Sequence, residues 1–126
     1  MKPQLQHMPH PSGLPLSRAV VVGNIAVLSG QVAANAQGQL VGSDVTGQTR
    51  HVLESIAQTL RELGAGMTDV FKATVWLADM ADFAAFNEEY RRHFDAARMP
   101  ARSTVQAGLF PGVLVEIEVQ AVVDAR

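Results

Sequence analysis

Hydrophobic and polar residues alternate strictly near the C-terminus of the chain. Residues 113–123 read VLVEIEVQAVV, and a strand, whose side chains have a period of two, separates them onto two faces. The apolar face then carries Val113, Val115, Ile117, Val119 and Ala121. The polar face carries Glu116, Glu118 and Gln120. The pattern predicts a strand with one face in the hydrophobic core.

Three further apolar runs predict strands. Residues 19–22 and 25–29 are separated by Gly23-Asn24, which is a two-residue hairpin signal. Residues 70–77 read VFKATVWL and are rich in β-branched and aromatic side chains, which favours another strand. A short run at 99–105 is also expected to be extended and supplies the fifth strand.

Residues 44–63 have the periodicity of a helix. Their apolar positions recur at helical spacing, at Val45, Val52, Ile56, Leu60 and Leu63. Ser43 or Asp44 can cap the N-terminus, because the side-chain oxygen of either residue can accept a bond from a free N–H of the first turn. Gly64 suits the C-terminal end.

A second helix is expected from Asp82 to about Ala96. Its aromatic residues recur at intervals of three and four, at Phe83, Phe86, Tyr90 and Phe94. Asn87 lies among them, and a buried amide must be hydrogen-bonded, so it is either a satisfied core or interface amide or a binding residue. The basic cluster 91–93 lies opposite the aromatic stripe, which is typical of a solvated helix face.

The expected elements follow in the order ββαβαββ. Residues 1–15 are polar and rich in proline and are expected to form an irregular lead-in. A chain of 126 residues falls in the usual size range of one domain, so residues 1–126 are expected to form a single unit. The order predicts an α+β fold in which a mixed sheet carries two helices on one face.

The composition argues against several classes of function. The net charge of −2 and the sequence pI near 6.0 do not favour nucleic acid, for which a basic patch and a pI above about 9 are expected. Without cysteine the chain cannot use a thiolate, and its scattered histidines and glycines form no recognisable metal or phosphate motif. The N-terminus has no apolar signal segment and no run of about 18 apolar residues follows. We expect a soluble cytoplasmic protein with no metal, cofactor, nucleic acid or membrane as its partner.

Arg102 and Glu116 are the main candidates for chemistry. A guanidinium keeps its charge and offers a rigid fork of donors that matches a carboxylate. The strand of Glu116 is expected to be the neighbour of the strand of Arg102, so that the pair can hold a small acid and activate a water molecule beside it. The alternative is a solvated sheet face with weak ion pairs. Ser29 is likewise either a strand-end hydroxyl bonded to the backbone or part of a pocket.

Several short motifs occur in a specific order from about residue 13 to the C-terminus. They are Gly23-Asn24, Ser29-Gly30-Gln31-Val32, Asp82-Phe83-Ala84 leading to Asn87 and Tyr90, Pro100-Ala101-Arg102-Ser103-Thr104-Val105, Pro111, and Val115-Glu116-Ile117-Glu118. Together they resemble the RidA/YjgF family of enamine/imine deaminases. The resemblance implies a chorismate-mutase-like homotrimer with its sites at subunit interfaces.

The resemblance also implies roles for single residues. Arg102 corresponds to the arginine that grips the substrate carboxylate, and Glu116 to the glutamate associated with the hydrolytic water. Ser29 and Asn87 match further pocket positions. Two positions depart from the family pattern: Leu16 stands where a tyrosine is expected, and Thr104 where a cysteine is frequent. The first departure puts the size and polarity of the pocket in question.

The implied activity is the hydrolytic deamination of reactive 2-enamine and 2-imine acids to 2-oxo acids and ammonia, without a cofactor. Arg102 would bind the carboxylate, Glu116 would activate water, and backbone groups near Ser29 and Thr104 would bond the imine nitrogen. One alternative is a non-catalytic trimeric module that binds a small carboxylate. Another is a ring-rearranging mutase, which requires a second arginine, for which Arg18 is the only candidate close in sequence to the first hairpin.

Overall fold

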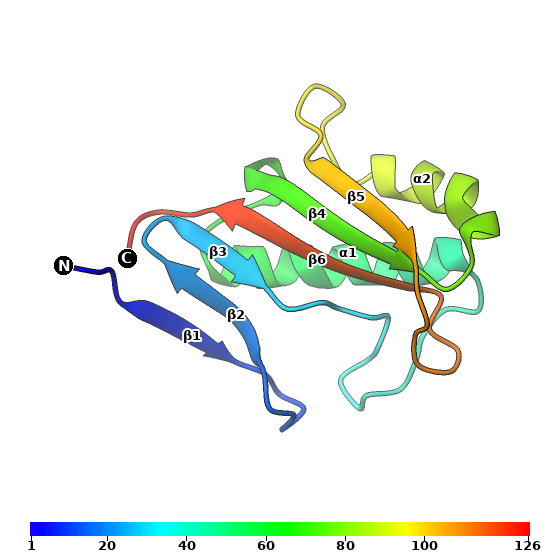
Figure 1. Cartoon of the computed structure of the whole chain (residues 1–126), viewed down its shortest axis with the longest axis horizontal. Helices are drawn as coiled ribbons and strands as arrows, with labels where there is room; N and C mark the ends of the chain where they lie inside the picture. Colours follow the sequence, from blue (N-terminus) through cyan, green and yellow to red (C-terminus); the bar gives the residue numbers. More distant parts are fainter.

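The computed structural model describes residues 1–126, which form one sheet covered by two α-helices on the same face (Figure 1). The elements in chain order are β1 (Leu5–Pro9), β2 (Ser17–Val22), β3 (Ile25–Leu28), α1 (Val45–Glu62), β4 (Val70–Leu77), α2 (Phe83–Arg91), β5 (Ala101–Gln106) and β6 (Val115–Val122). The strand order across the sheet is β1-β2-β3-β6-β4-β5. The β4–β5 pair is parallel and the other pairs are antiparallel. The predicted α+β fold is therefore confirmed.

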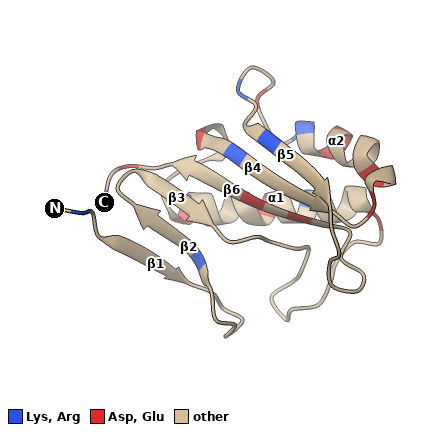
Figure 2. Ribbon diagram, viewed as in Figure 1, with Lys and Arg blue, Asp and Glu red and all other residues tan.

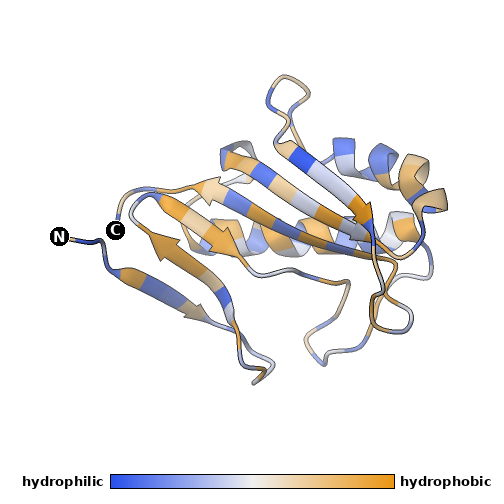
Figure 3. Ribbon diagram, in the orientation of Figure 1, coloured by the Kyte–Doolittle hydropathy of each residue, from blue (hydrophilic) through white to orange (hydrophobic).

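The alternation in β6 divides its residues between the two faces as predicted. Val115, Ile117, Val119 and Ala121 are buried, whereas the residues between them are half-buried. Figure 3 shows the same alternation as hydrophobic and hydrophilic bands along the strand. Because β6 lies between β3 and β4, its buried face forms the centre of the core.

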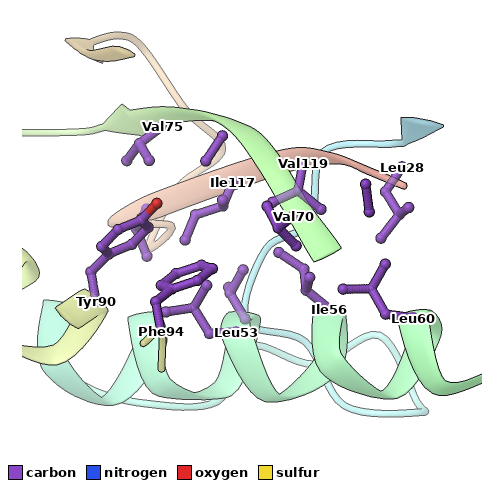
Figure 4. Packing of buried hydrophobic residues seen from close by; sticks show 14 of the residues in the cluster. Leu28, Leu53, Ile56, Leu60, Val70, Val75, Tyr90, Phe94, Ile117 and Val119 are labelled. Atoms are coloured by element: carbon purple, nitrogen blue, oxygen red, sulfur yellow. The ribbon is translucent and has the colours of Figure 1, made fainter. Parts of the chain in front are cut away.

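The core fills the space between the sheet and the two helices. Figure 4 shows side chains of the sheet directed toward α1, with Ile117 of β6 above Leu53 and Val70 of β4 above Ile56. Tyr90 and Phe94 close the core near α2, with their ring centroids 4.7 Å apart. Neither helix has the length and apolar character needed to span a membrane.

The first hairpin and the first helix have the predicted form. Val22 pairs with Ile25 across the two-residue turn, and Gly23 takes the positive φ of 60° that such a turn requires. Asp44 is the N-cap of α1, where its carboxylate accepts a bond of 2.8 Å from the N–H of Gly47. Local side-chain chemistry was sufficient to predict both elements.

The prediction of an irregular lead-in was wrong for residues 5–9, which form β1 at one edge of the sheet. This strand pairs with β2 and leaves four of its five residues exposed, so no apolar periodicity marks it. Pro9 lies at its end, beside a register shift, where an edge strand tolerates a residue without an N–H. Backbone pairing with β2, rather than side-chain burial, defines this strand.

The second helix is shorter than predicted. It begins at Phe83 and ends at Arg91, about five residues before Ala96. The next residues form tighter turns, in which the N–H groups of Arg92 and His93 bond to carbonyls three residues back. Phe94 is still buried, so the aromatic spacing predicted the buried face correctly but not the helix end.

A buried carboxylate on α2 gathers three basic side chains. Glu89 is 3% exposed, and its oxygens lie 3.1 Å from Arg50 of α1, 3.2 Å from Arg92 and 2.7 Å from His93. Burial by itself raises the pKa of Glu89, but the hydrogen bonds from His93 and Arg50 outweigh this effect and the pKa is lowered from its ordinary value. Two residues of the basic cluster 91–93 therefore bind Glu89 instead of only facing solvent.

Glu89→Gln is expected to lower the free energy of unfolding at pH 7 by about 1–3 kcal/mol, since the amide loses charge-assisted hydrogen bonds. The pKa of Glu89 is lower in the folded state than its ordinary value of 4.5. The stabilisation by Glu89 is therefore complete above pH 4.5 and is lost as the pH falls through the folded-state pKa. Urea denaturation of the wild type and of Glu89→Gln should show a difference in the free energy of unfolding that becomes smaller in acid. Glu88→Gln is the control, because Glu88 is 67% exposed. An equal loss in both variants would contradict the role of the buried cluster.

Candidate functional site

The guanidinium of Arg102 is held between an amide and three aromatic rings of α2. Its Nη2 donates a bond of 2.8 Å to Oδ1 of Asn87. Its Cζ lies 4.7 Å from the ring centroid of Tyr90, 5.2 Å from that of Phe86 and 5.7 Å from that of Phe83. Cation–π attraction and the hydrogen bond together fix the direction of the group. Only one of the five N–H donors of Arg102 is used within the chain, so the remaining donors can bind an anion.

The spacing of residues on α2 produces this arrangement. Four residues of α2 follow one another at intervals of three, one and three residues and therefore share one face of the helix: Phe83, Phe86, Asn87 and Tyr90. That face packs beneath β5, the edge strand that carries Arg102. The position of Asn87 among aromatic residues, which was unusual in the sequence, is explained by its bond to Arg102.

A pocket of about 310 Å³ opens beside Arg102. Its lining consists of Asn87, Tyr90, Arg91, Met99, Pro100 and Arg102. The lining contains two guanidinium groups and no carboxylate, which favours an anionic ligand. Arg91 was expected on a solvated face, and its place in this pocket was not predicted. The available signal was its spacing, because Arg91 lies four residues after Asn87.

Glu116 lies in a different setting, against the segment that follows β3. Gln31 of that segment pairs with Ile117 through two backbone hydrogen bonds of 2.8 and 3.1 Å, which brings Gly30 beside Glu116. A Cβ atom at Gly30 would overlap Oε2 of Glu116 and lie 3.2 Å from its Cδ. Gly30 is therefore required by the close approach of this carboxylate, and its own N–H has no acceptor in the chain.

The carboxylate of Glu116 also borders a second pocket, of about 320 Å³. The pocket is lined by Gly108, Leu109, Phe110, Pro111 and Glu116, and Phe110 is 80% exposed. Partial burial raises the pKa of Glu116, and the nearby negative charge of Glu118 adds to the effect. No donor in the chain bonds to this carboxylate. A carboxylate with a raised pKa is suited to accept a proton from water.

Arg102 and Glu116 are not neighbours within one chain, and the expectation that they lie on adjacent strands was wrong. The strand β4 lies between β5 and β6, as the separated basic and acidic bands in Figure 2 show. Arg102 is paired with Ala73, which is buried beneath the helices, whereas Glu116 is paired with Trp76 on the opposite face. One chain thus presents the cation and the carboxylate on different faces of its sheet.

Of the three other candidate residues, Ser29 precedes Gly30 and Thr104 lies on the strand of Arg102. The hydroxyl of Ser29 donates a bond of 2.6 Å to the carbonyl of Ser17, which is the backbone role considered for a strand-end hydroxyl. Leu16 immediately precedes Ser17 and is 40% exposed. Thr104 shares the face of Arg102, and its Oγ1 is buried without a hydrogen-bond partner in the chain.

Arg18 does not supply a second arginine to either pocket. Its Nη2 lies 2.8 Å from Oε2 of Glu62, so it connects β2 to the end of α1. The second arginine beside Arg102 is Arg91. No group of three or more histidine, aspartate or glutamate side chains is arranged to hold a metal ion.

Comparison with known proteins gives consistent matches over most of the chain. A RutC family protein of Pyrococcus abyssi is 41% identical over 112 residues, which cover 87% of each chain. A goat (Capra hircus) protein named 2-iminobutanoate/2-iminopropanoate deaminase is 41% identical over 110 residues, which cover 86% of this chain and 80% of the relative.

The fold agrees with these matches. The crystal structure of a YjgF family member from Neisseria meningitidis superimposes with a TM-score of 0.86 at 32% identity, covering 97% of each chain. The family model described as endoribonuclease L-PSP matches residues 6–123. The chain therefore belongs to the RidA/YjgF family, also called the RutC or L-PSP family.

Proposed function

We propose that the protein hydrolyses reactive 2-enamine and 2-imine acids to 2-oxo acids and ammonia. The observation that carries the proposal is the guanidinium of Arg102, which is fixed by Asn87 and aromatic rings and keeps most of its donors free. The relative that is named a 2-iminobutanoate/2-iminopropanoate deaminase supports this class of substrate. Such imines react with water unaided, so the protein needs to position the substrate and assist proton transfer.

In this proposal Arg102 binds the substrate carboxylate through two parallel hydrogen bonds. Bidentate pairing fixes the plane of the carboxylate and so the direction of the adjacent imine carbon. Asn87 keeps the guanidinium in place while the ligand enters, and the hydroxyl of Thr104 lies on the same face of β5.

Glu116 accepts a proton from water as the water oxygen attacks the imine carbon. The N–H of Gly30, which has no acceptor in the chain, can bond to the imine nitrogen. The protonated carboxyl then returns the proton to the nitrogen, which gives a carbinolamine. Glu116 next takes the proton of the new hydroxyl group and passes it to the nitrogen as the carbon–nitrogen bond breaks, so that ammonia and the 2-oxo acid leave. Ser29 orders this segment through its bond to the carbonyl of Ser17.

A complete site requires two copies of the chain, because one chain holds Arg102 and Glu116 on opposite faces. We therefore propose a homotrimer in which Arg102 of one subunit meets Glu116 of the next. The face of the sheet away from the helices supports association, since Val27 and Val122 are 42% and 44% exposed there. Trimer formation would cover these side chains.

Co-refolding two inactive variants tests the shared site. Arg102→Ala and Glu116→Gln chains are each expected to be inactive alone, but in an equal mixture about one quarter of the interfaces would combine a native Arg102 with a native Glu116. The assay generates the imine with an amino-acid oxidase and times its hydrolysis against trapping by semicarbazide. Activity equal to the sum of the separate variants would place the site within one subunit.

The alternative is a non-catalytic module that binds a small carboxylate. Leu16 favours it, because this side chain cannot donate the hydrogen bond of a tyrosine. The same assay separates the two functions when it is run with several imine side chains. Wild-type protein that binds 2-oxo acids but accelerates none of the hydrolyses would support the binding module and contradict the enzyme.

A further inference from the structure

We propose that Arg91 determines the specificity of this site by binding a second carboxylate, so that the preferred substrates are imines of dicarboxylic 2-oxo acids. The inference rests on the proposed function, and it concerns the end of the substrate that is distant from the reacting carbon. The imine of such an acid arises where the amine of an acidic amino acid is oxidised, so the class of reaction that supplies it is amino-acid oxidation.

The geometry of α2 places two guanidinium groups around one pocket. Arg91 follows Asn87 by one helical turn and therefore lies on the same side of α2, while Asn87 accepts the bond from Arg102. Both arginines line the pocket of about 310 Å³. Figure 2 shows basic residues at the C-terminal end of α2 beside the basic band of β5. A ligand held by Arg102 thus has a second cation within the same pocket.

Arg91 is the basic residue of its cluster that remains available to a ligand. Its partner within the chain is Glu88, at 3.4 Å, and both side chains are more than half exposed, so their ion pair is weak. By contrast, Arg92 and His93 are bound to the buried carboxylate of Glu89. A ligand carboxylate can replace Glu88 as the partner of Arg91 at little cost.

The remaining walls suit the carbon chain between two carboxylates. Met99 and Pro100 are the apolar residues of the lining, and methylene groups can pack against them. The volume is at the lower end of the range of about 300–1,000 Å³ typical of small-ligand sites, which fits a short diacid. No acidic side chain lines the pocket to repel it.

Two ligands with the same carbon chain test this inference. 2-Oxoglutarate and 2-oxopentanoate differ by the distal carboxylate, and their affinities can be measured by calorimetry. We expect wild-type protein to bind 2-oxoglutarate about five- to tenfold more tightly, and Arg91→Gln to remove that preference by weakening the binding of 2-oxoglutarate much more than that of 2-oxopentanoate. Arg98→Gln makes the same change of charge on an exposed residue outside the pocket, and it should keep the preference.

Equal wild-type affinities for the two ligands would overturn the inference, and so would an equal loss in Arg91→Gln and Arg98→Gln, which would indicate a general field effect. The measurement is independent of turnover. A preference for the diacid without any hydrolysis would retain the role of Arg91 and reject the enzyme. Rapid hydrolysis without that preference would support the enzyme and reject the role of Arg91.

Discussion

Arg102→Lys is expected to reduce imine hydrolysis by about 100-fold or more, although it retains the positive charge. An ammonium group lacks the planar fork that pairs with both oxygens of a carboxylate. It also loses the fit to the rings of Phe86 and Tyr90 and the directed bond to Asn87, which hold the guanidinium in one orientation. Steady-state kinetics with an enzymatically generated imine would measure the loss, and calorimetry with a 2-oxo acid would show whether binding falls in parallel.

The matched control for this substitution is Arg98→Lys. Arg98 is exposed in the loop before β5 and lies outside the pocket lining, so its replacement should leave hydrolysis unchanged. The thermal stability of both variants should also be measured, because Arg102 contacts the core-facing rings of α2 and its replacement can affect folding. A correctly folded Arg102→Lys protein with nearly native activity would contradict the assignment of Arg102 as the carboxylate-binding residue.

Glu116→Gln is expected to reduce hydrolysis by a factor of about 10²–10⁴ while carboxylate binding persists. The amide preserves the shape of the side chain beside Gly30 but cannot accept a proton from water. Binding is expected to survive because Arg102, and not Glu116, holds the ligand. Kinetics and calorimetry on the same preparation would measure the rate of hydrolysis and the affinity for the carboxylate separately. In Arg102→Lys, both quantities should fall together.

The pH dependence gives an independent test of Glu116. Its ionised form is the active form, and its pKa is raised by burial and by Glu118. The rate should therefore fall on acidification at a higher pH than for an ordinary glutamate. Glu118→Gln removes the neighbouring negative charge and should move this acidic limb to lower pH. A limb that does not respond to Glu118→Gln would mean that another group controls the rate.

The sequence was most informative where one face of an element is buried. The alternation in residues 115–122 and the spacing of the apolar residues in α1 both predicted which side chains are buried, because the pattern itself results from burial. The strand β1 has no such pattern, since its partner β2 holds it by backbone bonds at an exposed edge. The end of α2 was also missed, because Phe94 remains buried after the helix has ended.

Local periodicity and ordered short motifs were enough to predict the family, the α+β fold, and Arg102, Asn87 and Glu116 as candidate residues. How these residues are grouped depends on the packing of the whole chain. Strand order is set by contacts between segments far apart in the sequence, and it places β4 between β5 and β6. The same packing brings Arg91 of α2 and Arg102 of β5 into one pocket. It also places Gly30, after β3, against Glu116 of β6.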